Sequence, residues 1–459
     1  MEQITKPHCG ARLDRLPDCR WHSSMFAIVA FGLLVCWSNA VGGLILAQLK
    51  ALGWTDNSTT ATFSAITTAG MFLGALVGGI IGDKTGRRNA FILYEAIHIA
   101  SMVVGAFSPN MDFLIACRFV MGVGLGALLV TLFAGFTEYM PGRNRGTWSS
   151  RVSFIGNWSY PLCSLIAMGL TPLISAEWNW RVQLLIPAIL SLIATALAWR
   201  YFPESPRWLE SRGRYQEAEK VMRSIEEGVI RQTGKPLPPV VIADDGKAPQ
   251  AVPYSALLTG VLLKRVILGS CVLIAMNVVQ YTLINWLPTI FMTQGINLKD
   301  SIVLNTMSMF GAPFGIFIAM LVMDKIPRKT MGVGLLILIA VLGYIYSLQT
   351  SMLLITLIGF FLITFVYMYV CYASAVYVPE IWPTEAKLRG SGLANAVGQI
   401  SAIAAPYAVA VLLSSYGVTG VFILLGAVSI IVAIAIATIG IETKGVSVES
   451  LSIDAVANK

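Results

Sequence analysis

Charged residues are scarce in this sequence. Only 12% of its 459 residues are Asp, Glu, Lys or Arg, compared with about 25% in soluble proteins. His occurs three times, and the seven Cys are scattered without a C-x-x-C pair. The composition therefore excludes a soluble globule, a disordered chain and a coiled coil, and the cysteines predict neither a disulfide framework nor a zinc site.

Several motifs of enzymes and pumps are also missing. We find no Walker lysine motif, no metal-ligand cluster and no nucleophile elbow. The glycines Gly122, Gly124 and Gly126 follow no predicted strand, so they do not indicate a nucleotide loop. The sequence thus predicts no enzymatic activity, no cofactor and no bound metal.

Apolar residues, in contrast, make up 56% of the chain and gather in twelve long blocks. A membrane-spanning helix needs roughly 20 apolar residues, and most blocks reach that length. The blocks are 24–49, 62–82, 90–108, 113–137, 152–174, 182–199, 266–291, 302–323, 331–349, 352–378, 391–415 and 418–440. They predict an all-α membrane protein with twelve transmembrane helices.

The net charge of +8 has an uneven distribution. Of the 32 Lys and Arg, 28 lie in the tails, the 200–265 stretch and alternate turns, whereas the opposite turns hold only Lys50, Arg181 and Lys299. This asymmetry is the positive-inside pattern, so both termini and the 200–265 stretch are expected in the cytoplasm. We therefore expect a multi-pass protein of a plasma membrane or bacterial inner membrane, with the bilayer as partner, no nucleic acid and a monomeric state.

The chain divides into similar halves. Acidic and basic turn motifs recur after the second and eighth, fourth and tenth, and sixth and twelfth blocks, at separations of 238 to 244 residues. A duplication of about 240 residues explains this register and predicts two pseudo-symmetric six-helix bundles. The expected parts are a tail (1–23), a first bundle (24–202), a linker loop (203–265), a second bundle (266–440) and a second tail (441–459).

Six spaced motifs together resemble one family. They are G-x-x-G-D-x-x-G-R-R ending at Arg88, Arg118 with its following glycines, E-x-x-P-x-x-x-R-G from Glu138, its counterpart from Glu380, P-E-S-P-R-W-L from Pro203, and E-T-K-G from Glu442. This set resembles the major facilitator superfamily and its sugar-porter branch. The resemblance implies that a small-molecule substrate binds between two bundles near the membrane midplane and is released by rocking.

The charged turns are the expected gate. Their residues either form ion pairs that break when the cytoplasmic mouth opens, or are solvated loop ends without such a role. We expect Asp83 to lie against the eleventh helix, and Arg87 and Arg145 to bridge to Glu204 or Glu380. The candidate gating residues are Asp83, Arg87, Glu138, Arg145, Glu204, Arg207, Asp324, Arg328, Glu380 and Arg389. The second turn has Pro327 where the first has Gly86, a departure from the pattern.

Ionisable residues within the apolar blocks are only Glu95, His98 and Arg118. Such residues are costly in a bilayer and often functional. Glu95 and His98, three residues apart, share a helix face, so they form either a structural pair or the proton-coupling site. The resemblance implies an acid in the first helix, but Asn39 occupies that place and cannot titrate. We therefore expect Arg118 to bind an anionic group of the substrate.

The seventh block bears on substrate identity. The Gln pair typical of hexose porters falls on Ala275 and Met276, whereas the W-L-P-T ending after Asn285 resembles transporters of aromatic and other organic acids. The candidate substrate-binding residues are Arg118, Asn39, Trp158, Asn277, Gln280, Tyr281, Asn285, Trp286, Tyr367, Tyr372, Asn395 and Gln399.

These observations predict a secondary-active transporter of a small polar metabolite, with an organic or sugar acid as the favoured substrate. Proton coupling remains open. The alternatives are a sugar or polyol porter, proton-coupled or facilitative, and a transporter-like sensor that binds the solute and signals through its cytoplasmic surface.

Overall fold

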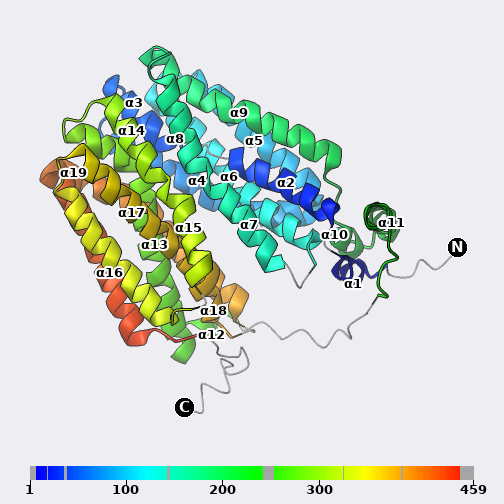
Figure 1. Ribbon diagram of the computed structural model, residues 1–459. Helices are drawn as coiled ribbons and strands as arrows, with labels where there is room; N and C mark the ends of the chain where they lie inside the picture. The colour runs from blue at the N-terminus through cyan, green and yellow to red at the C-terminus, as the bar shows by residue number, and fades with distance from the viewer. Residues whose placement is uncertain are drawn as a thin grey trace. The chain divides into compact units, whose positions relative to one another are not determined.

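Helices form nearly all of the regular structure. The computed structural model describes residues 7–17, 19–35, 39–141, 145–240, 253–323, 325–383 and 386–444, and within these ranges it contains helices and turns but no strand. The all-α prediction is confirmed for this part of the chain. Figure 1 shows most helices running alongside their neighbours in long bundles.

Nine of the helical spans in the described residues are long and apolar enough to cross a membrane. The elements in chain order are α1 (Cys9–Asp14), α2 (Arg20–Val35), α3 (Gly42–Ala51), α4 (Asn57–Thr85), α5 (Arg87–Ala106), α6 (Met111–Tyr139), α7 (Arg145–Asn157), α8 (Ser159–Leu170), α9 (Ala176–Tyr201), α10 (Pro206–Ser211), α11 (Tyr215–Thr233), α12 (Tyr254–Leu257), α13 (Gly260–Thr293), α14 (Leu298–Met309), α15 (Gly311–Val322), α16 (Arg328–Ser347), α17 (Met352–Val370), η2 (Cys371–Tyr377), α18 (Val378–Glu380) and α19 (Lys387–Ile439).

Several apolar blocks are interrupted within the structure. The block 302–323 forms two helices, α14 and α15, with Phe310 between them. In α19, Gly417 has φ 65° and ψ −160°, a non-helical conformation between the last two apolar blocks. Residues Cys371–Tyr377 form a π-helical segment, a feature often found at functional sites. Fewer spans than apolar blocks appear because α19 runs through the last two blocks as one span, whereas the blocks 24–49 and 152–174 are each divided between shorter helices.

Glycines bring neighbouring helices into backbone contact. A Cβ atom on Gly70 or Gly74 of α4 would collide with the backbone of α6. Gly311 and Gly315 of α15, 241 residues later in each case, lie equally close to the backbone of α17. Small residues let membrane helices approach closely, so the sequence repeat has a counterpart in helix packing.

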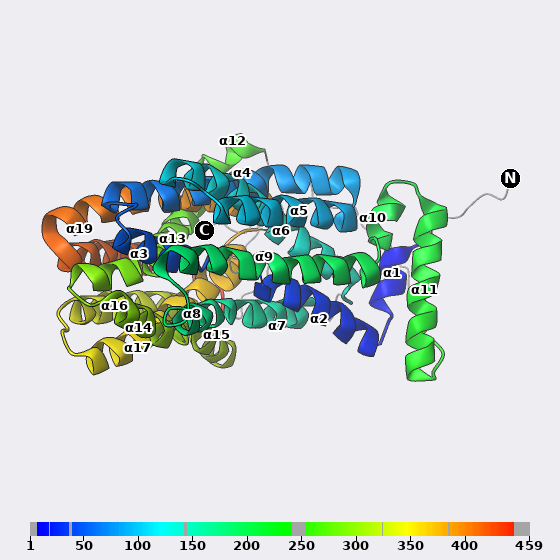
Figure 2. The same ribbon diagram turned by 90° about the horizontal axis from the view of Figure 1, so that it is seen from above.

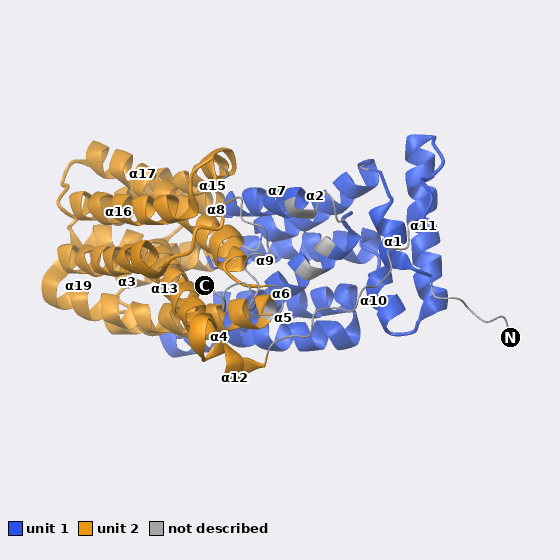
Figure 3. Ribbon diagram, turned by 90° about the horizontal axis from the view of Figure 1, so that it is seen from below, with its two compact units in different colours: residues 1–39, 70–159, 184–246 blue, residues 40–69, 160–183, 247–459 orange. Residues whose placement is uncertain are grey.

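The described chain separates into two compact units (Figure 3). Unit 1 contains residues 1–39, 70–159 and 184–246, and unit 2 contains 40–69, 160–183 and 247–459. Each unit therefore combines segments that are distant in the sequence. In unit 2, α3 and α8 from the first half of the chain pack with helices of the second half. This grouping differs from the division expected from the repeat, which remains a prediction.

One end of unit 1 carries three short amphipathic helices, α1, α10 and α11. Figure 2 shows α11 running across the axes of α5 and α9. Cys9 and Leu13 of α1, Trp208 of α10 and Met222 and Ile225 of α11 share one buried apolar core. From the sequence, residues 1–23 are expected as a tail before the first bundle. In the structure the apolar residues of α1 complete a core that α11 alone leaves open.

Candidate functional site

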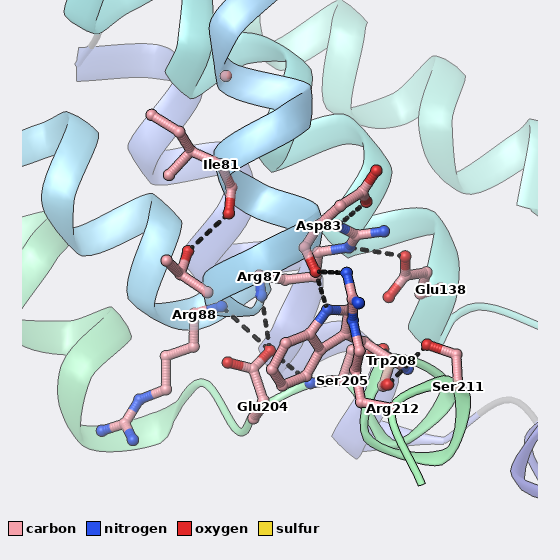
Figure 4. Close-up of polar contacts among 12 residues, drawn as sticks. Ile81, Asp83, Arg87, Arg88, Glu138, Glu204, Ser205, Trp208, Ser211 and Arg212 are labelled. Atoms are coloured by element: carbon pink, nitrogen blue, oxygen red, sulfur yellow. Dashed lines mark hydrogen bonds and ion pairs between the residues drawn. The ribbon is translucent and has the colours of Figure 1, made fainter.

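An ion-pair cluster in unit 1 centres on Arg87. Its guanidinium lies 2.6 Å from Asp83 Oδ1 and 2.9 Å from Glu138 Oε1 (Figure 4). Arg87 and Glu138 are partly buried, whereas the Asp83 side chain is 64% exposed. The carboxyl end of α4, the start of α5 and the end of α6 therefore meet through one guanidinium.

Glu204 completes this cluster in an unexpected way. Its Oε1 accepts hydrogen bonds from the main-chain N–H groups of Arg87 at 2.7 Å and Arg88 at 3.2 Å, at the first turn of α5. The expected side-chain pair between Arg87 and Glu204 is wrong, because Glu204 satisfies the open N–H groups of a helix start. Gly86 has φ 96°, and a Cβ there would collide with Glu204, so only glycine fits this position.

A second cluster in unit 2 has the same core. Arg328 Nε lies 3.0 Å from Glu380 Oε2, and Glu442 Oε1 accepts from the Arg328 N–H at 2.7 Å. Thr443 Oγ1 also donates to Glu380 at 2.6 Å. Burial opposes ionisation of Glu442, but hydrogen bonds from main-chain N–H groups outweigh it and hold its pKa below the ordinary value. The repeated turns thus produce repeated chemistry.

The other gating candidates have different surroundings. Arg207 pairs with Asp14 of α1 at 2.9 Å, and Arg389 lies with its guanidinium carbon 5.2 Å from the ring centre of Tyr254. The side chain of Arg145 and the whole of Asp324 lie outside the described residues. The structure therefore joins six candidates into the two clusters, four in unit 1 and two in unit 2.

The buried ionisable residues expected within the membrane lie in unit 1. Glu95 and His98 of α5 are fully buried, and Glu95 Oε2 lies 3.6 Å from His98 Nδ1. Arg118 of α6 is 1% exposed, and its Nη1 lies 3.2 Å from Met121 Sδ. The predicted pair between Glu95 and His98 is present as a close contact, since their spacing of three places both on one helix face.

Two further substrate candidates in unit 1 are less enclosed. Asn39 is half-buried in the turn before α3. Trp158 lies at the break between α7 and α8 and is 37% exposed. A large aromatic side chain that stays accessible at a helix break is suited to contact a ligand.

Unit 2 gathers the remaining substrate candidates on α13, α17, η2 and α19. Asn277, Asn285 and Trp286 of α13 are buried, and the Asn277 amide donates to Leu273 O at 2.9 Å. Gln280 and Tyr281 of the same helix are half-buried. Asn395 is exposed and donates to Ser391 O, so its geometry favours a role on the surface of α19.

Several polar atoms in this part of unit 2 are buried without a hydrogen-bond partner among the described residues. They include Trp286 Nε1, Tyr367 Oη, Tyr372 Oη and Gln399 Oε1, all on predicted substrate-binding residues. Such atoms are costly to leave unpaired. A polar ligand or water that accepts and donates hydrogen bonds would satisfy them.

Sequence reasoning missed other polar residues of unit 2. Tyr160 of α8 contacts Tyr367 edge to face, with ring centres 5.4 Å apart. Asn305 of α14 donates to Ser164 Oγ at 3.1 Å, and its Oδ1 is buried without a partner among the described residues. Their only signal was a polar side chain in an apolar block, which neutral residues share with ordinary packing positions.

Within unit 2, residues from the first half of the chain also contact residues from the second half. A Cβ on Gly43 of α3 would collide with the backbone of α13 at Ile284 and Asn285. Asn57 Nδ2, at the start of α4, donates to Ser414 Oγ of α19 at 2.8 Å. The loops that connect these helices belong to the side with few basic residues. The first-half segments are therefore held against the second half at this side.

The described ranges hold no group of three or more His, Cys, Asp or Glu that could bind a metal ion. The described residues offer instead a buried guanidinium and a carboxylate beside an imidazole in unit 1, and buried amides and hydroxyls in unit 2. These groups are suited to binding a polar solute.

Comparison with known proteins identifies the family. The model of the Major Facilitator Superfamily matches residues 26–406. This chain is 44% identical over 455 residues to the inner membrane metabolite transport protein YdjE of Escherichia coli K12, covering 98% of this chain and 99% of that one. It therefore belongs to the Major Facilitator Superfamily and is a multi-pass membrane transport protein.

Other similar proteins are named for different solutes. The niacin transporter NiaP of Acinetobacter baylyi is 25% identical over 448 residues, covering 96% of this chain and 99% of that one. Among solved structures, the inward open conformation of the xylose transporter XylE from E. coli has a TM-score of 0.74 at 16% identity, covering 94% of this chain and 99% of that one. The latter likeness establishes the fold alone.

Proposed function

We propose that this protein is a secondary-active transporter of a small polar metabolite, and that its favoured substrate is an organic or sugar acid. Arg118 carries the substrate assignment. It is 1% exposed within the spanning segment Met111–Phe133, where an ionisable side chain usually serves function. A guanidinium keeps its charge and binds a carboxylate in a bidentate manner.

Three further observations support an acidic substrate. The resemblance implies an acid in the first helix, but this chain has Asn39, which supplies no competing charge. One relative is named as a niacin transporter, and niacin is an aromatic carboxylic acid. The seventh block also lacks the hexose Gln pair and ends in W-L-P-T.

The transport cycle follows from the architecture we propose. Twelve helices form two pseudo-symmetric bundles, 24–202 and 266–440, in a bacterial inner membrane or a plasma membrane. The linker 203–265 and the tails 1–23 and 441–459 lie in the cytoplasm. The close contacts of Gly43 with α13 and of Asn57 with Ser414 represent the closed outer side. In the opposite state these contacts separate, and substrate reaches the buried amides and hydroxyls of unit 2 from outside. We propose that the transporter works as a monomer.

We assign proton coupling to Glu95 and His98. Both are fully buried and 3.6 Å apart, so a proton gained or lost there changes the charge of a dry pair and shifts the balance between conformers. Replacement of Glu95 by Gln should abolish accumulation of substrate against a gradient but preserve exchange.

A sugar or polyol porter is the second candidate. Relatives include the arabinose-proton symporter of Bacillus subtilis, 26% identical over 485 aligned positions, and a probable inositol transporter of Arabidopsis thaliana. The amides and hydroxyls of unit 2 would suit hydroxyl-rich solutes equally well. Arg118 distinguishes the two, because a neutral sugar does not need a buried cation.

Counterflow of labelled solute in proteoliposomes tests the proposal. The exchange rates of niacin and other aromatic acids, sugar acids, arabinose and inositol should be compared, each measured with the parent protein. We expect acids to exchange and neutral sugars to do so poorly. Arg118→Lys should weaken acid exchange and Arg118→Ala abolish it, whereas Arg231→Ala, at a side chain that is 78% exposed, should have no effect.

Asn39→Asp provides the complementary test. The new carboxylate would compete with the substrate for Arg118, so acid exchange should fall. Robust exchange of a neutral sugar by the parent, with Asn39→Asp harmless, would show that Arg118 is structural and that the sugar porter is correct. Binding without exchange of any solute would instead indicate a sensor.

A further inference from the structure

A cavity of about 610 Å³ lies in unit 1 beside α11, and Glu204 of the first charge cluster forms part of its lining. Arg88 of α5, Tyr201 of α9, Trp21 of α2 and Lys220 of α11 contribute to its lining. Pockets that hold small ligands measure about 300–1,000 Å³. The cavity therefore has room for a polar ligand.

The charges in this cavity do not cancel. Of its two acids, Glu204 is engaged by main-chain N–H groups of α5, and Glu217 forms two hydrogen bonds with Arg214 at 2.5 and 2.7 Å. Among the described residues, Arg88 and Lys220 remain as the lining cations without a carboxylate partner. A ligand that supplies negative charge would complete the site.

Arg88 is already oriented by the protein. Its Nη2 donates to Trp199 O at 2.6 Å, while its Nε is buried with no hydrogen-bond partner among the described residues. Figure 4 shows its side chain extending away from the contacts between Arg87, Asp83 and Glu138. Lys220 is exposed and forms no hydrogen bond or ion pair with another described residue. Two cationic groups on different helices are thus available for one anion.

The position of the cavity indicates where the anion comes from. Arg88 lies at the first turn of α5 and Tyr201 at the last turn of α9, both of which are long enough to span the membrane. Trp199 and Tyr201 are 64% and 59% exposed beside this end, and exposed Trp and Tyr are enriched at the level of lipid headgroups. The cavity therefore lies where headgroup phosphates are concentrated.

We propose that this cavity binds a phosphate group and that its source is the headgroup of an anionic phospholipid in the adjacent leaflet. Arg88 and Lys220 contact the phosphate oxygens, and the aromatic side chains of Trp21 and Tyr201 lie beside the glycerol region. A lipid held there links α11 to the ends of α5 and α9. Soluble phosphate compounds share the chemistry, and the experiment separates the two sources.

The test uses the full-length protein in detergent and measures lipid retention by native mass spectrometry and the unfolding temperature. Phosphatidylglycerol, phosphatidylcholine, diacylglycerol, glycerol phosphate and inorganic phosphate are added separately. We expect phosphatidylglycerol to be retained best and to raise the unfolding temperature. Each cation near a lipid surface contributes to anionic lipid binding, so Lys220→Gln should weaken retention roughly fivefold and Arg88→Gln at least as much.

Arg223→Gln is the matched control, because Arg223 lies on the same helix, pairs with Glu219 and does not line the cavity. It should retain phosphatidylglycerol as the parent does. Equal loss in Arg223→Gln, or equal retention of diacylglycerol by the parent, would overturn the site. Equal stabilisation by glycerol phosphate or inorganic phosphate would overturn the lipid as the source. If Arg88→Gln fails to fold, Lys220→Gln decides the outcome, because its exposed side chain supports no described contact.

Discussion

The two charge clusters show what a duplicated turn preserves and what it changes. Each contains an arginine at a helix start, a glutamate that binds its guanidinium and a second glutamate that accepts from its main-chain N–H. Around this shared core the clusters differ. The Arg87 side chain is 17% exposed, whereas the Arg328 side chain is 7% exposed and also donates to Met323 O.

The helix starts reach the same arrangement by different backbones. Gly86 precedes α5 with φ 96° and ψ 160°, and Pro327 precedes α16 with φ −57° and ψ 140°. In addition, Trp208 Nε1 and Arg212 Nη2 donate to Asp83 O, which connects the first cluster to α10 and its flanking turn. The comparison teaches that the three-residue core is the invariant part, while its coupling to surrounding elements differs between halves.

Removal of the carboxylate partner should reveal the largest difference. Glu380→Ala removes a carboxylate that binds the more buried Arg328 guanidinium and also accepts from Thr443, so we expect a loss of about 3 kcal/mol in the free energy of unfolding. Glu138→Ala leaves Arg87 with Asp83 and should cost about 1 kcal/mol. Thermal unfolding of the two variants in the same detergent measures both. Equal losses would show that the greater burial of Arg328 does not raise the cost of losing its glutamate.

Substitution before the helix start should have the next largest effect. Gly86→Ala forces a residue with a Cβ into a conformation that glycine alone adopts readily, and the Cβ would also displace Glu204, so we expect a loss of about 2 kcal/mol. Pro327→Ala has an ordinary backbone conformation and should stay within about 0.5 kcal/mol. The same unfolding assay applies. A harmless Gly86→Ala would contradict the proposed cap by Glu204.

Acidification should affect the helices coupled to the first cluster. Burial opposes ionisation of Glu226, but hydrogen bonds and charges from Arg12 and Arg15 outweigh it and hold its pKa below the ordinary 4.5. Stability from these contacts is therefore complete above about pH 4.5 and is lost as the pH falls through the lowered value. Labelling of the buried Cys9, with the other cysteines replaced, by a disulfide reagent active in acid should accelerate below this range. Arg12→Gln should accelerate it already at pH 7, whereas unchanged labelling would refute the link.

Asp83→Asn should have the smallest effect on stability. Its side chain is 64% exposed, and its ion pair with Arg87, four residues later, is open to solvent. We therefore expect the free energy of unfolding to fall by less than about 0.5 kcal/mol. Transport should nevertheless slow, because the group biases conformers without contacting substrate. Uptake and unfolding measured on one preparation separate the two effects. If the variant took up substrate at the parental rate, Asp83 would be a solvated loop residue with no role in gating.

The sequence predicted the helical class, the repeat and six of the residues that form the two clusters, because periodic apolarity and repeated charge are local properties of the chain. It did not predict that Glu204 and Glu442 accept from helix starts, since the partner atoms belong to the main chain and have no residue signature. It also missed the contact of α1 with α11 and the polar contacts of Tyr160 and Asn305. These depend on segments that are distant in the chain, which no local pattern encodes.

The contact between α1 and α11 has a consequence for biosynthesis. Arg12 and Glu226 are 214 residues apart, and a ribosome adds about 5–20 residues per second. Residues such as Leu13 and Cys9 therefore wait about 10 to 40 s for their packing partners while the intervening helices enter the membrane. Synthesis of α11 then completes the core at the end of unit 1. This core can pack before most of the second half of the chain has been synthesised.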